Sequence, residues 1–169
     1  MEARITLQLE LKDIFFHRVE RTPAIGKYIE SGGNFYMERN HLGEFIRLLS
    51  PYFNFSIWTV YPEMECKYFA NYLTTLGAYI LYYRNDCYQL QLENGEWYQG
   101  KRLKRLVTTG TEIDKLICIE ANIPVHDNHN NYFIIPAFYG EHDDQLLVSA
   151  TKLLELKNIG DTTRLNDFQ

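Results

Sequence analysis

The apolar and polar positions of this chain alternate between the period of a strand and the period of a helix. Ile5–Leu11 reads I-T-L-Q-L-E-L, an alternation that is typical of a β-strand. Further strands are predicted at Phe55–Val60, Ala78–Arg84, Leu116–Ile119 and Phe133–Ile135, the last of them closed by Pro136. Helices are predicted between the strands, near residues 41–51, from Pro62 to Gly77 and near 143–157. This order favours an α/β fold with a Rossmann-like parallel sheet flanked by helices.

The predicted helices carry apolar side chains at helical spacing. The face of the first helix consists of Leu42, Phe45, Ile46 and Leu49. The face of the second helix is predicted to consist of Met64, Tyr68, Phe69, Tyr72, Leu73 and Leu76. Pro62 suits the first position of that helix, and Gly77 suits its end. Acidic residues open the last helix, where they complement its dipole.

Two segments are more than a bare Rossmann-like unit needs. Residues 13–38 are predicted as an irregular flap with a turn at Gly32-Gly33, and 87–98 as a β-hairpin insertion whose turn is Asn94-Gly95. The rings in these segments are of types enriched at interface cores, and they are also types that pack a hairpin onto a sheet. The sequence leaves both roles open for Phe35, Tyr36, Tyr88, Trp97 and Tyr98.

Length and charge narrow the class of protein. The 169 residues fit a single domain, predicted over 1–158 with a C-terminal tail at 159–169. A net charge of −5 speaks against nucleic acid as the main partner. No apolar run approaches the roughly 18 residues of a transmembrane helix. The first 15 residues carry acids and resemble no standard targeting peptide.

Several residues that could suggest chemistry have a simpler interpretation. Cys66, Cys87 and Cys118 are odd in number and lack a C-x-x-C spacing, so we expect reduced thiols. His126 and His129 stand in an Asn-rich loop with no third ligand, which favours a solvated loop over a metal site. The basic run at 101–105 is expected to be a solvated or partner-facing stripe in this acidic chain.

The carboxyl end of the first strand lies where an open α/β sheet normally carries its ligand or its catalytic group. Here the alternate positions are Glu10, Lys12 and Ile14. A carboxylate, an ammonium group and a branched alkane make a poor metal site and a poor nucleophile pair. The sequence therefore predicts no metal site and no cofactor at this edge.

Two longer strings resemble a known family. Residues 39–45 read R-N-H-L-G-E-F and are similar to the R-P-H-L-x-E-F that opens a helix in small haloacid-dehalogenase-like phosphatases. Residues 136–144 read P-A-F-Y-G-E-H-D-D and resemble the P-x-x-W-x-G-x-x-D-D of the same proteins. Between them, F-S-I-W-T-V, G-K-R-L-K-R-L and L-I-C-I-E-A-N-I-P follow in the order of that family. The resemblance is to the carboxy-terminal-domain phosphatases, also called NLI-interacting-factor-like.

The resemblance implies which positions would carry the chemistry. In active members the first Asp of D-x-D-x-T is the nucleophile, and the second Asp is the general acid and base. A Thr or Ser and a Lys bind the phosphoryl oxygens, and further acids bind magnesium. The matching positions here are Glu10, Lys12 and Ile14 in the first motif, then Thr59, Lys101 and Glu120. The nucleophile is thus one methylene longer and the acid is replaced by a cation. We expect a non-catalytic pseudophosphatase; an active, magnesium-dependent protein serine/threonine phosphatase is the alternative.

Several roles are open for the positions that remain. Glu10 and Glu120 are expected to pair with Lys12 and Lys101 in a buried ionic cluster, and the alternatives are an anion or phosphopeptide site at Thr59 and Lys101 or residual catalysis. His17 and His41 match positions in the resemblance and are expected to cap or pack.

Within the family, L-E-L-K-D-I-F-F-H at 9–17 and G-N-F-Y at 33–36 resemble the receptor subunit of the mitochondrial presequence translocase. This implies an accessory, protein-binding subunit of a mitochondrial inner-membrane assembly, either the import machinery or a respiratory or ATP-synthase complex. A cytoplasmic or nuclear location is the alternative. The chain starts almost at its first strand with no anchor before it, so we expect a soluble subunit recruited to other proteins.

Overall fold

A five-stranded parallel sheet forms the centre of the computed structural model, which describes residues 4–22, 26–91, 93–100, 113–122 and 131–159. The strand order is β10-β9-β1-β5-β6, and every adjacent pair is parallel. The strands are β1 (Thr6–Leu9), β5 (Asn54–Trp58), β6 (Ile80–Arg84), β9 (Leu116–Glu120) and β10 (Tyr132–Ile134). The predicted fold class and the predicted strands are confirmed. The division into a domain at 1–158 and a tail stays a prediction.

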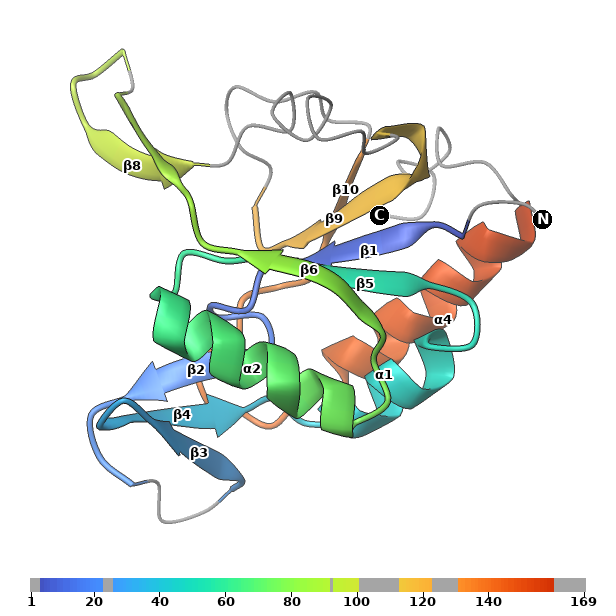
Figure 1. Ribbon diagram of the computed structural model, residues 1–169, viewed down its shortest axis with the longest axis horizontal. Coiled ribbons are helices and arrows are strands. Elements are labelled where there is room, and N and C mark those ends of the chain that lie inside the picture. Colours follow the sequence, from blue (N-terminus) through green and yellow to red (C-terminus); the bar gives the residue numbers. More distant parts are fainter. Residues whose placement is uncertain (1–3, 23–25, 92, 101–112, 123–130, 160–169) are drawn as a thin grey trace.

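The described helices pack against one face of this sheet (Figure 1). They are α1 (Leu42–Leu49), α2 (Glu63–Thr75) and α4 (Gln145–Ile159), and a short 3-10 helix η1 (Ile113–Lys115) precedes β9. Leu7 and Leu9 of β1 point into the core that the three helices cover. Gln8, between them, lies on the opposite face and donates to the Cys118 sulfur at 3.4 Å. Among the described residues, no helix combines the length and apolar content of a membrane span.

The predicted helical faces are partly correct. All of the apolar positions predicted for α1 are buried. In α2, Phe69 and Leu73 are buried as predicted, but Met64 and Tyr68 are 66% and 41% exposed, so their assignment to the core is wrong. The buried face of α2 includes Glu65 and Cys66 instead, because it is rotated toward the flap. Pro62 caps the helix rather than forming its first turn.

The flap is an antiparallel sheet, so the prediction of an irregular segment is wrong. Its strands are β2 (Phe16–Val19), β3 (Tyr28–Ser31) and β4 (Asn34–Glu38), in the order β2-β4-β3. The strands are only four or five residues long, too short to show a clear period in the sequence. The predicted turn is confirmed, because Gly32 and Gly33 have φ values of 59° and 77° and connect β3 to β4. A tight hairpin turn requires such values.

The predicted hairpin is also confirmed. Strands β7 (Tyr88–Gln91) and β8 (Trp97–Gly100) pair antiparallel around the turn that contains Asn94 and Gly95. Figure 1 shows this hairpin projecting away from the five-stranded sheet. The basic run at 101–105 and His126 and His129 lie outside the described residues.

Gly77 and Gly43 offer a paired test of the backbone at helix ends. Gly77 follows α2 with a φ of 105°, whereas Gly43 lies inside α1 and has open space where a Cβ would be placed. We expect Gly77→Ala to lower the free energy of unfolding by about 1–2 kcal/mol, because a side chain is strained in the left-handed region. Gly43→Ala should raise it by about 0.5–1 kcal/mol. Urea denaturation of both variants measures this, and equal effects would contradict it.

Candidate functional site

Glu10 and Thr59 meet at the carboxyl edge of the parallel sheet. Glu10 follows β1 and Thr59 follows the adjacent β5, and both side chains are buried. The Thr59 hydroxyl donates to Glu10 Oε1 at 2.5 Å, and the backbone N–H of Lys12 donates to the same oxygen at 3.0 Å. Thr59 Oγ1 in turn accepts the backbone N–H of Tyr61 at 3.3 Å. The first and second motifs of the sequence are therefore joined by a buried hydrogen bond.

Lys12 contributes its backbone, not its charge, to this pair. Its side chain is exposed, so the structure corrects the expected buried ion pair between its ammonium group and Glu10. Ile14 is fully buried in the core, where its side chain contributes packing. Glu120 ends β9, two strands from Thr59 on the same edge, and is half-buried. Lys101 lies outside the described residues, so its part in the expected cluster stays a prediction.

A shallow pocket of about 300 Å³ opens beside the Glu10–Thr59 pair. Its lining residues are Lys12, Asp13, His17, Arg18, Val60 and Tyr61. Lys12 and Arg18 are exposed cations, and the Asp13 carboxylate lies 2.8 Å from His17 Nδ1. Burial raises the pKa of Tyr61 far above its usual range, with a further contribution from the negative charge of Asp13. The pocket can therefore accept a small anionic group against its two cations, while Tyr61 stays a neutral phenol that donates to the Phe16 carbonyl.

The described residues do not fit the magnesium site that the family resemblance implies. No group of three or more His, Cys, Asp or Glu side chains among them is arranged to hold a metal ion. One Glu10 oxygen already accepts two hydrogen bonds, and Lys12, two residues further along the chain, carries a cation. A magnesium ion prefers several free oxygen ligands in near-octahedral arrangement. The described residues at this edge therefore offer too few oxygen ligands for a magnesium ion.

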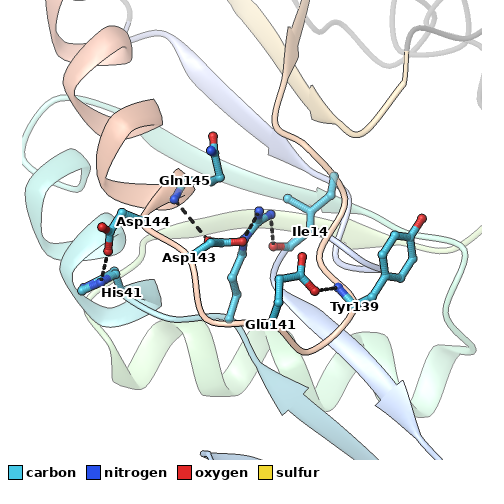
Figure 2. Close-up of polar contacts among 8 residues, drawn as sticks. Ile14, His41, Tyr139, Glu141, Asp143, Asp144 and Gln145 are labelled. Carbon is cyan, nitrogen blue, oxygen red and sulfur yellow. Dashed lines mark hydrogen bonds and ion pairs between the residues drawn. The ribbon is translucent and has the colours of Figure 1, made fainter.

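Figure 2 shows a second constellation, which joins the two strings that carry the resemblance. Arg39 precedes α1 and is 1% exposed, and Asp143 precedes α4. The Arg39 guanidinium donates to both Asp143 oxygens, at 3.1, 3.2 and 2.8 Å, and to the Ile14 carbonyl at 3.1 Å. Asp143 Oδ1 also accepts the backbone N–H of Gln145 at 3.2 Å and so caps α4. This bidentate ion pair is a structural clamp.

The histidines act beside this clamp as expected. His41 has a φ of 66° and places its Nε2 2.9 Å from Asp144 (Figure 2). Its Nδ1 lies 3.3 Å from Glu44. His17 contacts Asp13 and packs edge-on against the Tyr139 ring. Both residues make packing or polar contacts with neighbouring side chains, in agreement with the expectation that they cap or pack.

The structure separates the rings that were predicted as interface anchors. Tyr36 is 1% exposed, and its ring packs between Tyr61 and Phe69 at centroid distances of 5.3 and 5.1 Å. Its burial, followed by the charge of Glu65, raises its pKa to about 12. The sequence leaves an interface role and a packing role open for Tyr36, and the structure corrects the interface role, because β4 turns this side chain into the core. Phe35, on the other face of β4, is half-buried against Tyr28.

Trp97 is the hairpin ring whose side chain the structure describes, and it is 65% exposed. The side chains of Tyr88 and Tyr98 lie outside the described part, so their interface role stays a prediction. Cys66, Cys87 and Cys118 are reduced thiols, as expected.

Sequence reasoning missed the Arg39–Asp143 pair and the roles of Arg18 and Tyr61 at the pocket. The pair had a signal, because both residues belong to the strings that resemble the family. Arg18 had none, because the register of the short flap strands is not evident from the sequence. Tyr61 had none either, because it lies in the short connection between β5 and α2, which has no periodic pattern.

Comparisons with known proteins agree with this fold. A family model described as NLI interacting factor-like phosphatase matches residues 5–164. One similar solved structure is a variant of the fission yeast RNA polymerase II CTD phosphatase Fcp1 bound to beryllium fluoride, with 14% sequence identity and a TM-score of 0.55. Another is Fcp1, described as an essential RNA polymerase II CTD phosphatase, with 17% sequence identity and a TM-score of 0.58. Each match covers 97% of this chain, which spans only 54% and 52% of those chains. At such identities the likeness shows the fold alone. No curated protein matches the chain.

The clamp gives a matched test of burial. We expect Asp143→Ala to lower the free energy of unfolding by about 3–5 kcal/mol, because it leaves the buried Arg39 cation without its carboxylate. Asp144→Ala, at a side chain that is 71% exposed, should cost about 1 kcal/mol or less. Thermal and chemical denaturation measure both changes, and a similar loss in the two variants would count against the clamp.

Proposed function

Since the chain belongs to the NLI interacting factor-like phosphatase family, we propose that it is a non-catalytic member, a pseudophosphatase that serves as a protein-binding or structural accessory subunit. The observation that carries this proposal is the state of Glu10. Its carboxylate accepts the Thr59 hydroxyl and the Lys12 amide inside the protein. Both hydrogen bonds go to Oε1 and fix the orientation of the carboxylate, whereas a nucleophile must turn an oxygen toward phosphorus.

The length of the Glu10 side chain and the charge of Lys12 also speak against catalysis. By the resemblance, Glu10 occupies the place of an Asp nucleophile and is one methylene longer. A displacement of about 1 Å of a reacting group can cost on the order of 100-fold in rate. Lys12 stands at the place of the general acid and base, and an exposed ammonium group has no lone pair with which to take a proton from an attacking water.

The binding function is proposed for the parts outside the sheet edge. The hairpin projects from the domain and presents Trp97, a residue type that often anchors interfaces. The partners would be other protein subunits. The resemblance at 9–17 and 33–36 favours a mitochondrial inner-membrane assembly, either import machinery or a respiratory or ATP-synthase complex. Purification of tagged complexes from the native source would identify the neighbours and the compartment.

The alternative is an active magnesium-dependent serine/threonine phosphatase. The cationic pocket beside Thr59 favours it, since Lys12 and Arg18 could receive a phosphoryl group. A retained anion or phosphopeptide site without turnover would use the same pocket. The solved relatives act on the RNA polymerase II CTD, so phosphoserine peptides are suitable probes of both alternatives.

An activity assay decides between these functions. With p-nitrophenyl phosphate and phosphoserine peptides in millimolar Mg²⁺, we expect turnover no faster than in buffer, because the reacting positions hold an engaged Glu and a Lys. Any trace activity should persist in Glu10→Gln and Thr59→Val, since it would come from a contaminant. Turnover that disappears in both variants would establish an enzyme.

Trp97 and Tyr36 test the binding role as a contrasting pair. We expect Trp97→Ala to leave the melting temperature within about 2 °C of wild type, because a largely exposed ring contributes little packing. The same variant should weaken capture of the native partners by about 2 kcal/mol, or roughly 30-fold.

Tyr36→Ala is the control, and its buried ring should cost about 3–5 kcal/mol of stability. Quantitative co-purification and thermal melts measure the two effects. Undiminished capture by a folded Trp97→Ala protein would remove the hairpin from the interface.

A further inference from the structure

The outer edge of the five-stranded sheet is formed by β6. One side of this strand pairs with β5, with Ile57 opposite Tyr83 and Trp58 opposite Arg84. Within the described parts of the chain, no strand pairs with its other side. Figure 1 shows β6 running along this edge above α2. An edge strand presents backbone N–H and C=O groups that can pair with a further strand.

Three large side chains at this edge are open to solvent. Tyr79, Leu81 and Tyr83 are 69%, 46% and 43% exposed. The residues between them hold the strand in place, since Ile80 packs against the main core and the Tyr82 hydroxyl donates to Gln8 at 3.1 Å. The pairing with β5 has one extra residue on β6 between Ile80 and Tyr83, a bulge of the kind that re-aims side chains.

A hollow of about 400 Å³ runs beside this edge. It is lined by Ala70, Asn71 and Thr74 of α2 and by Ile80–Tyr83 of β6. The helix side of the hollow is polar but uncharged, and the strand side is aromatic and aliphatic. Such a groove can accept the aromatic side chains of an added strand.

The charges at this edge favour a second copy of the same chain. Natural edges are commonly protected by Lys or Pro, and Ile80–Arg84 contains neither. Its only charged residue, Arg84, is paired with Asp86 and lies over the Trp58 ring at 4.3 Å. Two copies of this neutral edge therefore meet without repulsion.

We propose that β6 pairs antiparallel with β6 of a second copy, around a twofold axis at Tyr82, and so extends the sheet across a homodimer. In this register Leu81 of each copy faces Tyr83 of the other, and Ile80 faces Arg84. The outward positions are thus self-complementary, as an interface with twofold symmetry requires. Backbone hydrogen bonds supply the attraction along the strand, as in other cases of strand addition.

The area that these three side chains expose limits the surface that the dimer can bury. Large side chains bury about 150–250 Å² each when fully covered. At exposures of 69%, 46% and 43%, the three from each copy provide roughly 300 Å², or about 600 Å² for the pair. Stable interfaces bury about 1,200–2,000 Å², so the homodimer is a weak one that forms as the concentration of the chain rises.

Sedimentation velocity of the full chain from about 1 to 300 µM tests the pairing, with two double variants at the same positions. Leu81→Lys with Tyr83→Lys places like charges opposite each other and should give a monomer throughout. Leu81→Lys with Tyr83→Glu places each Lys opposite a partner's Glu and should keep the dimer. Val148→Lys, at a position on α4 that is 47% exposed, is the matched control and should dimerise like wild type.

A wild-type chain that stays monomeric at the highest concentration overturns the proposal. Equal loss of the dimer in both double variants, with melting temperatures showing intact folds, overturns the register and with it the β6 pairing. Loss of the dimer in Val148→Lys places the contact on another surface. None of these results depends on whether the protein has phosphatase activity or on the role of its hairpin.

Discussion

A buried arginine is the constraint on which much of this structure depends. Arg39 cannot stay inside the protein unless its charge and its donors are satisfied. Asp143 neutralises the charge, the Ile14 carbonyl takes one further hydrogen bond, and the Phe138 ring lies 5.5 Å from the guanidinium carbon. These partners come from the loop after β1 and from the segment before α4, while Arg39 itself joins the flap to α1. One side chain thus fixes the approach of segments that are about 100 residues apart in the sequence.

The clamp also fixes the loop that carries the family's reacting positions. The Arg39 backbone N–H donates to Phe15 at 2.9 Å, and Phe138 donates to the Asp13 carbonyl at 2.6 Å. Asp13 itself has a φ of 58°, which a loop held from several sides can maintain. The loop is therefore held by these backbone hydrogen bonds and by the Arg39 side chain, in addition to the hydrogen bond from the Lys12 backbone N–H to Glu10.

Elements whose buried positions follow a regular pattern could be predicted from the sequence. Elements whose role depends on how one short strand pairs with its neighbour could not. The central strands β1, β5 and β9 are apolar enough to be predicted, and α1 shows its buried face directly. The flap was missed because short strands such as β3 contain too few residues to establish a period. An interface role stayed open for Tyr36 because its residue type is common at interfaces, and only the pairing of β4 decides that its ring points into the core. Glu10 and Thr59 were both assigned to reacting positions by the family resemblance, but the hydrogen bond between them was not predicted.

The same register explains why the flap belongs to the core and is not a separate lid. Glu65, in the first turn of α2, is buried and lies within hydrogen-bond reach of the Tyr36 hydroxyl and the Asn34 amide. An acid at a helix N-terminus is favoured by the dipole, which offsets part of its desolvation. The Tyr72 hydroxyl, also on α2, donates to Glu38 at the end of β4.

Strand β4 is therefore attached to α2 through Glu65, which the helix carries, and through Glu38, which the helix binds. Because the inner rings of the flap are used for this attachment, they cannot also serve a partner. The aromatic surface that remains accessible among the described residues includes the hairpin tip and the β6 edge, and these two surfaces belong to different parts of the fold. The proposed partner protein and the proposed second copy of the chain would therefore contact different side chains.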